Sequence, residues 1–368
     1  MRLLYFSNSY IPSKDANSVH VMKMCHSFSK LASVTLYGSY GSEVGDPFKY
    51  YGITNRFDLV RIPKVKTFTS SVKYLITTIR GVEASKDLLV YGRNSLAVLL
   101  LSFKKMDVIY ESHALPSGLL RITLEKLLFR QRSFKKLVVI SDALKHDYLK
   151  TFPKMLESMI LVAHDGADIP TISLQNSTQN FKKAGQQLKL QVGYIGHLYQ
   201  GRGIDIVIKL ASSYSDADFH IIGGADEDLN YWQGLADLPT NLKFYGHVDH
   251  YRLSEYYQSF DVLLAPYQSG VNQGDGLSDT SRWMSPMKIF EYMSYAKPII
   301  SSDIPVLKEV LNDSNSILVS PCDIDEWTSA LDSLNCINKR HKLGAKAFKD
   351  LKDYYTWDQR AKTILESV

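Results

Sequence analysis

The sequence predicts an α/β protein with two doubly wound, Rossmann-like domains. Residues 1–172 alternate short apolar strands with amphipathic helices, which is the pattern of a parallel sheet covered on both faces. A polar stretch at 173–188 has few apolar residues and is typical of a linker, and the alternation then resumes from 189 to 350. In such sheets ligands bind beyond the carboxyl ends of the strands, so we expect the two domains to face a cleft.

Each domain contains its own series of strands and helices. In the first domain we predict strands at 3–7, 33–37, 88–91, 108–111, 137–141 and 160–164, and helices at 19–30, 71–80, 96–103, 118–130 and 142–150. In the second we predict strands at 190–196, 219–222, 242–245, 262–265, 298–301 and 317–319, and helices at 204–212, 253–259, 286–295, 306–311 and 324–334. The tail also has helical periodicity, interrupted near Thr356 and Asp358, either of which can cap a helix.

Composition narrows the class of protein. A chain of 368 residues is too long to fold around one ordinary hydrophobic core, so two domains are expected. Its content of 45% hydrophobic and 22% charged residues is typical of a globular protein. The longest apolar run, 95–103, is too short to span a bilayer, and the N-terminus resembles a first strand more than a signal peptide. Three scattered cysteines favour a reducing cytoplasm. Residues 1–170 hold 24 basic and 14 acidic side chains against 19 and 24 in the remainder, so the first half suits an anionic surface or acceptor.

The segment SPMKIFEYM at 285–293 carries the strongest functional signal. It places Lys288 and Glu291 three residues apart at the start of a predicted helix. A helix N-terminus offers unpaired N–H groups and a positive dipole, which suit a phosphate. Lys288 adds a full charge, and Glu291 on the same face can accept hydrogen bonds from sugar hydroxyls. The segment therefore predicts a site for a nucleotide diphosphate.

A second segment, GYIGHLYQGRG at 193–203, follows a predicted strand and precedes a predicted helix. Its glycines let the backbone approach a phosphate closely, and Arg202 can pair with a phosphate through two hydrogen bonds. Glycine-rich turns are often only tight turns, so the glycines alone leave both interpretations open.

Several polar residues lie near predicted strand ends or helix starts. His113 comes just past a strand end, where a doubly wound domain presents side chains to its cleft, although a buried structural histidine is the alternative. His20 lies at a helix start for which Ser18 or Asn17 is the expected N-cap. The segment HDGAD at 164–168 ends the last strand before the linker, and its glycine and aspartates also suit a simple turn.

In chain order, these segments resemble the retaining glycosyltransferases with two Rossmann-like domains, the GT-B fold, and within them family 4, the glycosyl transferases group 1. The YGHV segment at 245–248 adds to the match, which covers nearly the whole chain and is strongest from 190 to 319. The resemblance implies an acceptor-binding domain at 1–172, a nucleotide-sugar-binding domain at 189–350, and a C-terminal helix at 351–368 that crosses back to the first domain.

The resemblance also implies roles for matched positions. Arg202 and Lys288 match groups that contact the donor diphosphate, His113 matches a cleft histidine near the transferred sugar, and Glu291 matches the second glutamate of a Glu-x7-Glu motif that holds the ribose. The further donor-binding positions are Gly196, His197, Gly201, Gly203, Gly246, His247, Val248, Ser285, Pro286 and Ile289. The positions implied for the acceptor or the cleft are Ser18, His20, Asp165 and Gly166.

Three positions depart from the family pattern. Trp283 stands where the first glutamate of the motif would touch the donor sugar, and Asp275 or Asp279 is our hypothesis for its replacement. His197 stands where an arginine often binds phosphate, which reduces the charge there near neutral pH. Residues 15–18, DANS, replace a glycine-rich turn.

The expected reaction is transfer of a sugar from a nucleotide diphosphate sugar to an acceptor hydroxyl with retention of configuration. We expect neither a metal nor another cofactor, because cationic side chains would neutralise the leaving diphosphate. The segment at 119–136 mixes apolar and basic residues, and Lys64, Lys66, Lys73 and Arg80 accompany Phe68 and Tyr74 nearby. This pattern suits an anionic membrane surface or an ordinary solvated helix face equally. The expected partners are a nucleotide-sugar donor and an envelope glycan or polyprenyl-linked acceptor, at the inner face of the cell membrane.

Other classes of function stay open. No nucleic-acid-binding module accompanies the basic residues, so we expect no nucleic acid partner. A nucleotide-sugar epimerase of related fold would use the same diphosphate site without an acceptor, and a non-catalytic nucleotide-sugar or glycan-binding module would show no turnover. The sequence does not determine the base, the sugar, the acceptor, the linkage or the oligomeric state.

Overall fold

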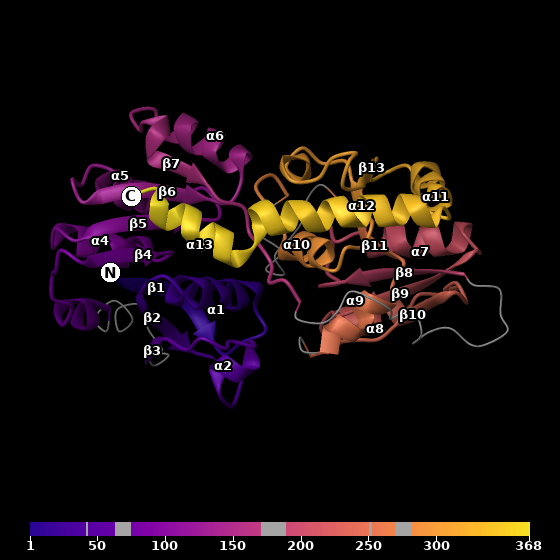
Figure 1. Ribbon diagram of the computed structural model, residues 1–368, viewed down its shortest axis with the longest axis horizontal. Coiled ribbons are helices and arrows are strands. Elements are labelled where there is room, and N and C mark those ends of the chain that lie inside the picture. The colour runs from indigo at the N-terminus through magenta and orange to yellow at the C-terminus, as the bar shows by residue number, and fades with distance from the viewer. Residues whose placement is uncertain (42, 63–74, 171–188, 250–251, 269–280) are drawn as a thin grey trace. The chain divides into compact units, whose positions relative to one another are not determined.

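The computed structural model describes residues 1–41, 43–62, 75–170, 189–249, 252–268 and 281–368. These residues form two compact units. The first joins Met1–His164 to Trp357–Val368, and the second comprises Asp165–Thr356. Each unit is built on one parallel sheet with accompanying helices (Figure 1). The α/β class with two Rossmann-like domains is therefore confirmed.

The sheet of the first unit has the strand order β3-β2-β1-β4-β5-β6-β7, and all of its neighbouring strands run parallel. The order reverses between β1 and β4, which is the point where a doubly wound sheet opens a crevice at its carboxyl edge. All of β4 is buried, as expected for a parallel strand covered on both faces. The strands are β1 (Arg2–Ile11), β2 (Ser33–Tyr40), β3 (Asp58–Ile62), β4 (Leu88–Gly92), β5 (Asp107–Ser112), β6 (Phe134–Val139) and β7 (Ile160–Val162).

The helices of this unit include one from the far end of the sequence. They are α1 (Ala16–Ser29), α2 (Pro47–Tyr50), α4 (Ser95–Phe103), α5 (Leu119–Leu128), α6 (Asp142–Thr151) and α13 (Trp357–Glu366). Helix α13 packs on α1 through an apolar stripe that includes Trp357, Ala361 and Ile364 (Figure 1). The predicted return of the C-terminal helix to the first domain is confirmed.

The sheet of the second unit has the order β10-β9-β8-β11-β12-β13, with the reversal between β8 and β11. Its strands are β8 (Leu190–Ile195), β9 (Ala217–Ile222), β10 (Leu242–Phe244), β11 (Val262–Ala265), β12 (Ile299–Ser302) and β13 (Ile317–Val319). Its helices are α7 (Ile204–Ser213), α8 (Asp226–Gln233), α9 (Leu253–Ser259), α10 (Met287–Ser294), α11 (Ile324–Ser333) and α12 (Ile337–Asp350). Fully buried Trp327 of α11 joins the apolar faces of α7, β8 and β9 in one core.

The unit boundaries differ from the positions that the sequence suggested. Ala167 forms a parallel bridge with Thr356, and its N–H donates to the carbonyl of Tyr355 at 3.1 Å. These bonds place the chain from Asp165 onward in the second unit, whereas the sequence suggested a boundary at 172. The tail leaves α12 through a π-helical turn, and extended Thr356 precedes α13. The segment that returns to the first unit therefore begins at Trp357 and not at 351.

Each expected strand overlaps an observed one, but some elements were missed. Helix α2 and strand β3 are short, and α8 has no fully buried residue, although its Leu229 and Trp232 pack against the core. The helix expected at 306–311 is wrong, because only a 3₁₀ turn, Leu307–Glu309, forms before the turn residues at 312–315.

Some predictions lie outside the described residues. They are the linker at 173–188, part of the helix at 71–80, Lys64, Lys66, Phe68, Lys73, Tyr74, Asp275 and Asp279. In the described parts of the chain, no helix combines the length and apolarity needed to cross a bilayer.

Candidate active site

The glycine-rich turn of the second unit joins β8 to α7. Gly196 follows the last residue of the strand, and Gly203 caps the helix with a φ of 78°, in the left-handed region. A Cβ at Gly203 would lie 1.7 Å from the carbonyl oxygen of Pro266, so only glycine fits. The carbonyl of Gly201 accepts a hydrogen bond from the N–H of Gln268 at 3.0 Å. The turn therefore packs closely on the chain that follows β11.

Arg202 lies within this turn and is held by aromatic side chains. Its Nη2 donates to the hydroxyl of Tyr199 at 2.7 Å, and its guanidinium lies over the rings of Tyr199 and Tyr267, 4.8 and 5.5 Å from their centroids. Arg202 makes no ion pair with any described residue. A guanidinium that is held in place without a carboxylate is prepared for an anionic ligand.

Lys288 is the second cation of this site. Its ammonium lies 4.0 Å from the ring centroid of Tyr194 and 4.3 Å from that of Tyr267, which Arg202 also contacts. The ammonium is buried and has no hydrogen-bond partner in the described part of the chain. Burial, with a smaller contribution from Arg202, lowers the pKa of Lys288 well below its usual value. Arg202 and Lys288, which we call the cationic pair, therefore share one aromatic support and lack a counter-ion among the described residues.

Helix α10 and the residues that precede it are held by two hydrogen bonds. The hydroxyl of Tyr292 accepts from the N–H of Ile195 at 3.0 Å, so the helix is tied to the end of β8. The hydroxyl of Ser285 accepts from the N–H of Asp165 at 2.8 Å. Pro286 is the N-cap and Ile289 is buried. The bond to Ile195 places the segment at 285–293 beside the glycine-rich turn that follows β8.

Glu291 and the YGHV segment complete the predicted donor positions. Tyr257 donates to Oε2 of Glu291 at 2.7 Å, which orients this carboxylate. The carbonyl of Gly246 accepts from the N–H of Gly223 at 2.8 Å, while His247 is exposed and Val248 is partly exposed. The carbonyl of His197 accepts from the hydroxyl of Tyr194 at 2.6 Å. Tyr194 therefore supports both the glycine-rich turn and Lys288.

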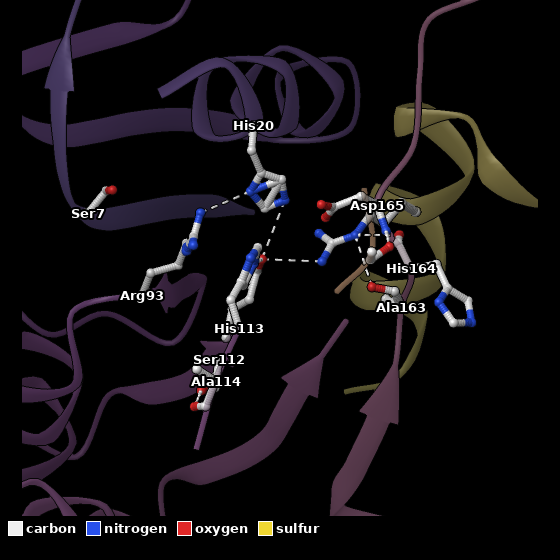
Figure 2. Close-up of polar contacts among 12 residues, drawn as sticks. Ser7, His20, Arg93, Ser112, His113, Ala114, Ala163, His164 and Asp165 are labelled. Atoms are coloured by element: carbon white, nitrogen blue, oxygen red, sulfur yellow. Dashed lines mark hydrogen bonds and ion pairs between the residues drawn. The ribbon is translucent and has the colours of Figure 1, made fainter. Parts of the chain in front are cut away.

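In the first unit, a buried glutamate organises the histidine site. Oε1 of Glu111, at the carboxyl end of β5, lies 2.5 Å from Nε2 of His113, 3.2 Å from Nη2 of Arg360 and 3.4 Å from Nε2 of His20. Tyr91 donates to the other oxygen of Glu111. Figure 2 shows His20 and His113 directed toward this point, with Arg93 beside them. Although burial alone raises the pKa of Glu111, the charge of Arg360 and the hydrogen bond with His113 hold it well below its usual range.

Both histidines of this cluster are held neutral. Burial, reinforced by the charge of Arg93, lowers the pKa of His113 to about 4, although Glu111 opposes this shift. Burial also lowers the pKa of His20 well below its usual value, and Nη1 of Arg93 lies 3.2 Å from its Nδ1. His113 keeps 21% of its side chain exposed, whereas Glu111 has none exposed. His113 is therefore the member of the cluster that a ligand can reach.

These shifts make the stability of the first unit depend on pH. The unfolded chain binds a proton at each histidine below about pH 6.5, but the folded unit does not bind one at His113 until about pH 4. Stability is therefore lost as the pH falls through this window, by up to about 1.4 kcal/mol per pH unit for each such group. We expect His113→Gln, which keeps a hydrogen-bonding group beside Glu111, to reduce this dependence. Hydrogen exchange of β5 at several pH values measures the stability of the first unit. If the variant kept the pH dependence of the wild type, His113 would not be its source.

His20, Glu111 and His113 also offer metal-ligand atoms that lie within 4.8 Å of one another. Two imidazoles and a carboxylate are a ligand set that Zn²⁺ accepts. However, Arg360 already binds the same carboxylate oxygen, and Arg93 lies against His20. Two adjacent positive charges oppose a divalent cation, so the cluster suits a neutral or anionic ligand group better.

The remaining predicted cleft residues have structural contacts. The hydroxyl of Ser18 lies inside α1 and donates to the carbonyl of Tyr10 at 2.8 Å. The expected N-cap at Ser18 or Asn17 is wrong, because α1 begins at Ala16 after Asp15. Asp165 and Gly166 belong to the second unit, where they are buried.

Sequence reasoning missed Glu111, Arg360 and Arg93 in the first unit. The sequence does contain a signal for Glu111, since this glutamate lies within an otherwise apolar strand. A glutamate is rarely fully buried unless it is paired, so its position indicates a partner in the fold. Arg360 lies 249 residues away in sequence, and nothing in its own segment indicates that contact. The aromatic support of the cationic pair was also missed, because Tyr194, Tyr199 and Tyr267 come from separate segments.

Comparison with known protein families finds one match, which lies within the second unit. Residues 189–335 match the model of the family described as glycosyl transferases group 1. This range contains both members of the cationic pair and Glu291. A search of the curated proteins finds no match to the chain.

Solved structures share the fold of the whole chain. HepE of Anabaena, crystallised with UDP, is 14% identical with a TM-score of 0.72, and the match covers 100% of this chain and 99% of HepE. The sucrose-phosphate synthase of Thermosynechococcus elongatus is 15% identical with a TM-score of 0.69, over 100% and 98% of the two chains. The lipopolysaccharide outer core galactosyltransferase WaaB is 13% identical with a TM-score of 0.68, over 100% and 99%. The chain thus has the GT-B fold of these structures, and residues 189–335 of its second unit match the glycosyl transferases group 1 model.

Proposed function

We propose that the protein is a retaining glycosyltransferase that moves a sugar from a nucleotide diphosphate sugar to an acceptor hydroxyl. The observation that carries this proposal is the cationic pair. A buried ammonium and a neighbouring guanidinium without a carboxylate are costly in a ligand-free protein. A diphosphate supplies the missing negative charge, and the developing charge of a leaving diphosphate is what such a site stabilises.

The donor is best represented by a uridine nucleotide. The fold of HepE is similar over its whole length, and HepE has been crystallised with UDP and with UDP-glucose. In this chain, Arg202 and Lys288 would contact the diphosphate, together with the N–H groups at the start of α10. Glu291, oriented by Tyr257, would accept hydrogen bonds from the ribose. Gly246, His247 and Val248 would contact the base through their backbone.

The first unit would provide the acceptor side and His113. A neutral imidazole can accept or donate one hydrogen bond without adding charge beside the sugar. Glu111 fixes the orientation of this ring, and Arg360 keeps Glu111 ionised. His113 would therefore position a sugar hydroxyl, whereas the cationic pair would assist departure of the nucleotide.

Proposed partners and location follow from the basic first half and from the similar structures. WaaB is a lipopolysaccharide outer core galactosyltransferase, which supports an envelope glycan as the acceptor class here. The basic and apolar helix α5 supports action at an anionic membrane surface. Because two side chains already neutralise the diphosphate, the reaction would need no divalent ion.

We expect purified enzyme with UDP-glucose and a lipid-linked glycan acceptor to form an α-linked product with the configuration of the donor retained. Proton NMR of the anomeric signal during turnover identifies the first-formed anomer, and added chelator should leave the rate unchanged. An inverted anomer would contradict retention, and a chelator-sensitive rate would contradict metal independence. Conversion of the donor without an acceptor would instead indicate an epimerase, and binding without turnover would indicate a binding module.

A further inference from the structure

A cavity of the first unit lies away from the histidine cluster. It has a volume of about 240 Å³ and lies between the end of α5 and the chain that connects α6 to β7. In a doubly wound unit each helix runs back from the carboxyl edge of the sheet, so α5 and α6 end at the amino edge. Glu111 and His113 follow the carboxyl end of β5. The cavity is therefore separate from the site already described.

The walls of the cavity are apolar. Phe129 and Phe152 stack edge to face, with ring centroids 5.0 Å apart, and Met155 continues the wall beside them. Methionine side chains adapt to flexible apolar ligands. Two large apolar residues next to the cavity lining, Leu127 and Leu156, are 40% and 65% exposed. This part of the surface is therefore suited to an apolar chain.

The rim of the cavity is basic. Lys126, Arg130 and Lys154 line it, and all three are exposed. None of the three pairs with an acidic side chain in the part of the chain that the structure describes. Three uncompensated cations around an apolar hollow are complementary to a molecule with one negative group and a hydrocarbon chain.

We propose that this cavity binds an anionic phospholipid, with the phosphate at Lys126, Arg130 and Lys154 and the end of one acyl chain against Phe129 and Met155. This inference rests on the proposed function, in which the protein acts at an anionic membrane surface, and it assigns the membrane contact to one lipid site. It uses none of the residues of the donor site. A free phosphate would leave the apolar walls exposed to water, so the acyl chain is an essential part of the ligand.

The test uses the full chain and a lipid that is soluble as a monomer. Dihexanoyl phosphatidic acid, kept below its critical micelle concentration, is titrated calorimetrically, with glycerol 3-phosphate as the chain-free comparison. We expect one equivalent of the lipid to bind and glycerol 3-phosphate to bind at least about tenfold more weakly, because each buried methylene gives about a fourfold gain. Equal affinity for both compounds would identify a free-phosphate site and overturn the proposal.

Matched double variants separate this site from general electrostatic attraction. We expect Lys126→Ala with Arg130→Ala to weaken lipid binding by about tenfold or more, since basic residues near an anionic headgroup each contribute roughly fivefold. Lys49→Ala with Lys86→Ala removes the same charge from exposed positions outside the cavity and should change binding less than about twofold. Equal losses in both pairs would overturn the proposal. Donor turnover with a soluble acceptor should be unchanged in both double variants, because neither changes the donor site. Absence of turnover in the wild type as well would contradict the proposed function and not the lipid site.

Discussion

Lys288→Met is expected to abolish most sugar transfer without destabilising the ligand-free protein. The substitution keeps an apolar stem against Tyr194 and Tyr267 but removes the buried ammonium. Loss of a group that stabilises a developing charge typically lowers turnover by about 100–1000-fold. The ammonium has no hydrogen-bond partner among the described residues, so its removal should leave the free energy of unfolding unchanged or raise it.

The matched control is Lys209→Met, at an exposed position on α7 of the same unit. Turnover and thermal unfolding are measured on both variants without nucleotide. The control should resemble the wild type in both measurements. A Lys288→Met protein that unfolds more easily would show that the lysine has a structural role, and one with normal turnover would remove it from the donor site.

Arg360→Met is expected to destabilise the first unit by about 3–5 kcal/mol. Arg360 is 3% exposed, and besides Glu111 its Nε donates to the carbonyl of His164 at 2.9 Å. Its removal leaves a buried carboxylate without its cationic partner, which should raise the pKa of Glu111 toward its usual value or above. Because Arg360 lies on α13, the end of the chain stabilises the site at β5.

Hydrogen exchange of β5 and α13 measures this loss within the first unit. Lys362→Met, on the exposed face of the same helix, should change the opening free energy by less than about 0.5 kcal/mol. The double variant Glu111→Gln with Arg360→Met also removes the buried carboxylate charge that Arg360→Met alone leaves unpaired. It should lose less stability than the sum of the two single variants, and strict additivity would contradict the coupling.

The sheets, the glycine-rich turn and the start of α10 could be predicted from the sequence because local patterns determine them. Buried parallel strands are continuous apolar runs, such as β8 and β11, and they alternate with helices of regular apolar period. The glycine-rich turn and the start of α10 were each predicted from their own residues to suit a phosphate, and the family resemblance implied that both contact one diphosphate. Their proximity is now explained by Tyr292, which ties α10 to Ile195.

The first-unit cluster could not be derived in the same way. Glu111, His20 and Arg360 come from β5, α1 and α13, and only the tertiary fold brings them together. The sequence also placed Ser18 at a helix cap, whereas its hydroxyl satisfies the carbonyl of Tyr10 inside the fold. Local capping rules did not anticipate this contact, because it depends on how β1 and α1 meet.

Calorimetric titration with UDP tests the cationic pair most directly. In the ligand-free protein the pKa of Lys288 is well below its usual value, and a bound diphosphate should raise it again. Between these two pKa values the wild type should take up a proton on binding, which appears as a dependence of the binding heat on the ionisation enthalpy of the buffer. Lys288→Met should show no such uptake and should bind UDP about 10–100-fold more weakly. Equal affinity in the two proteins, with no proton uptake in either, would contradict a diphosphate site at Arg202 and Lys288.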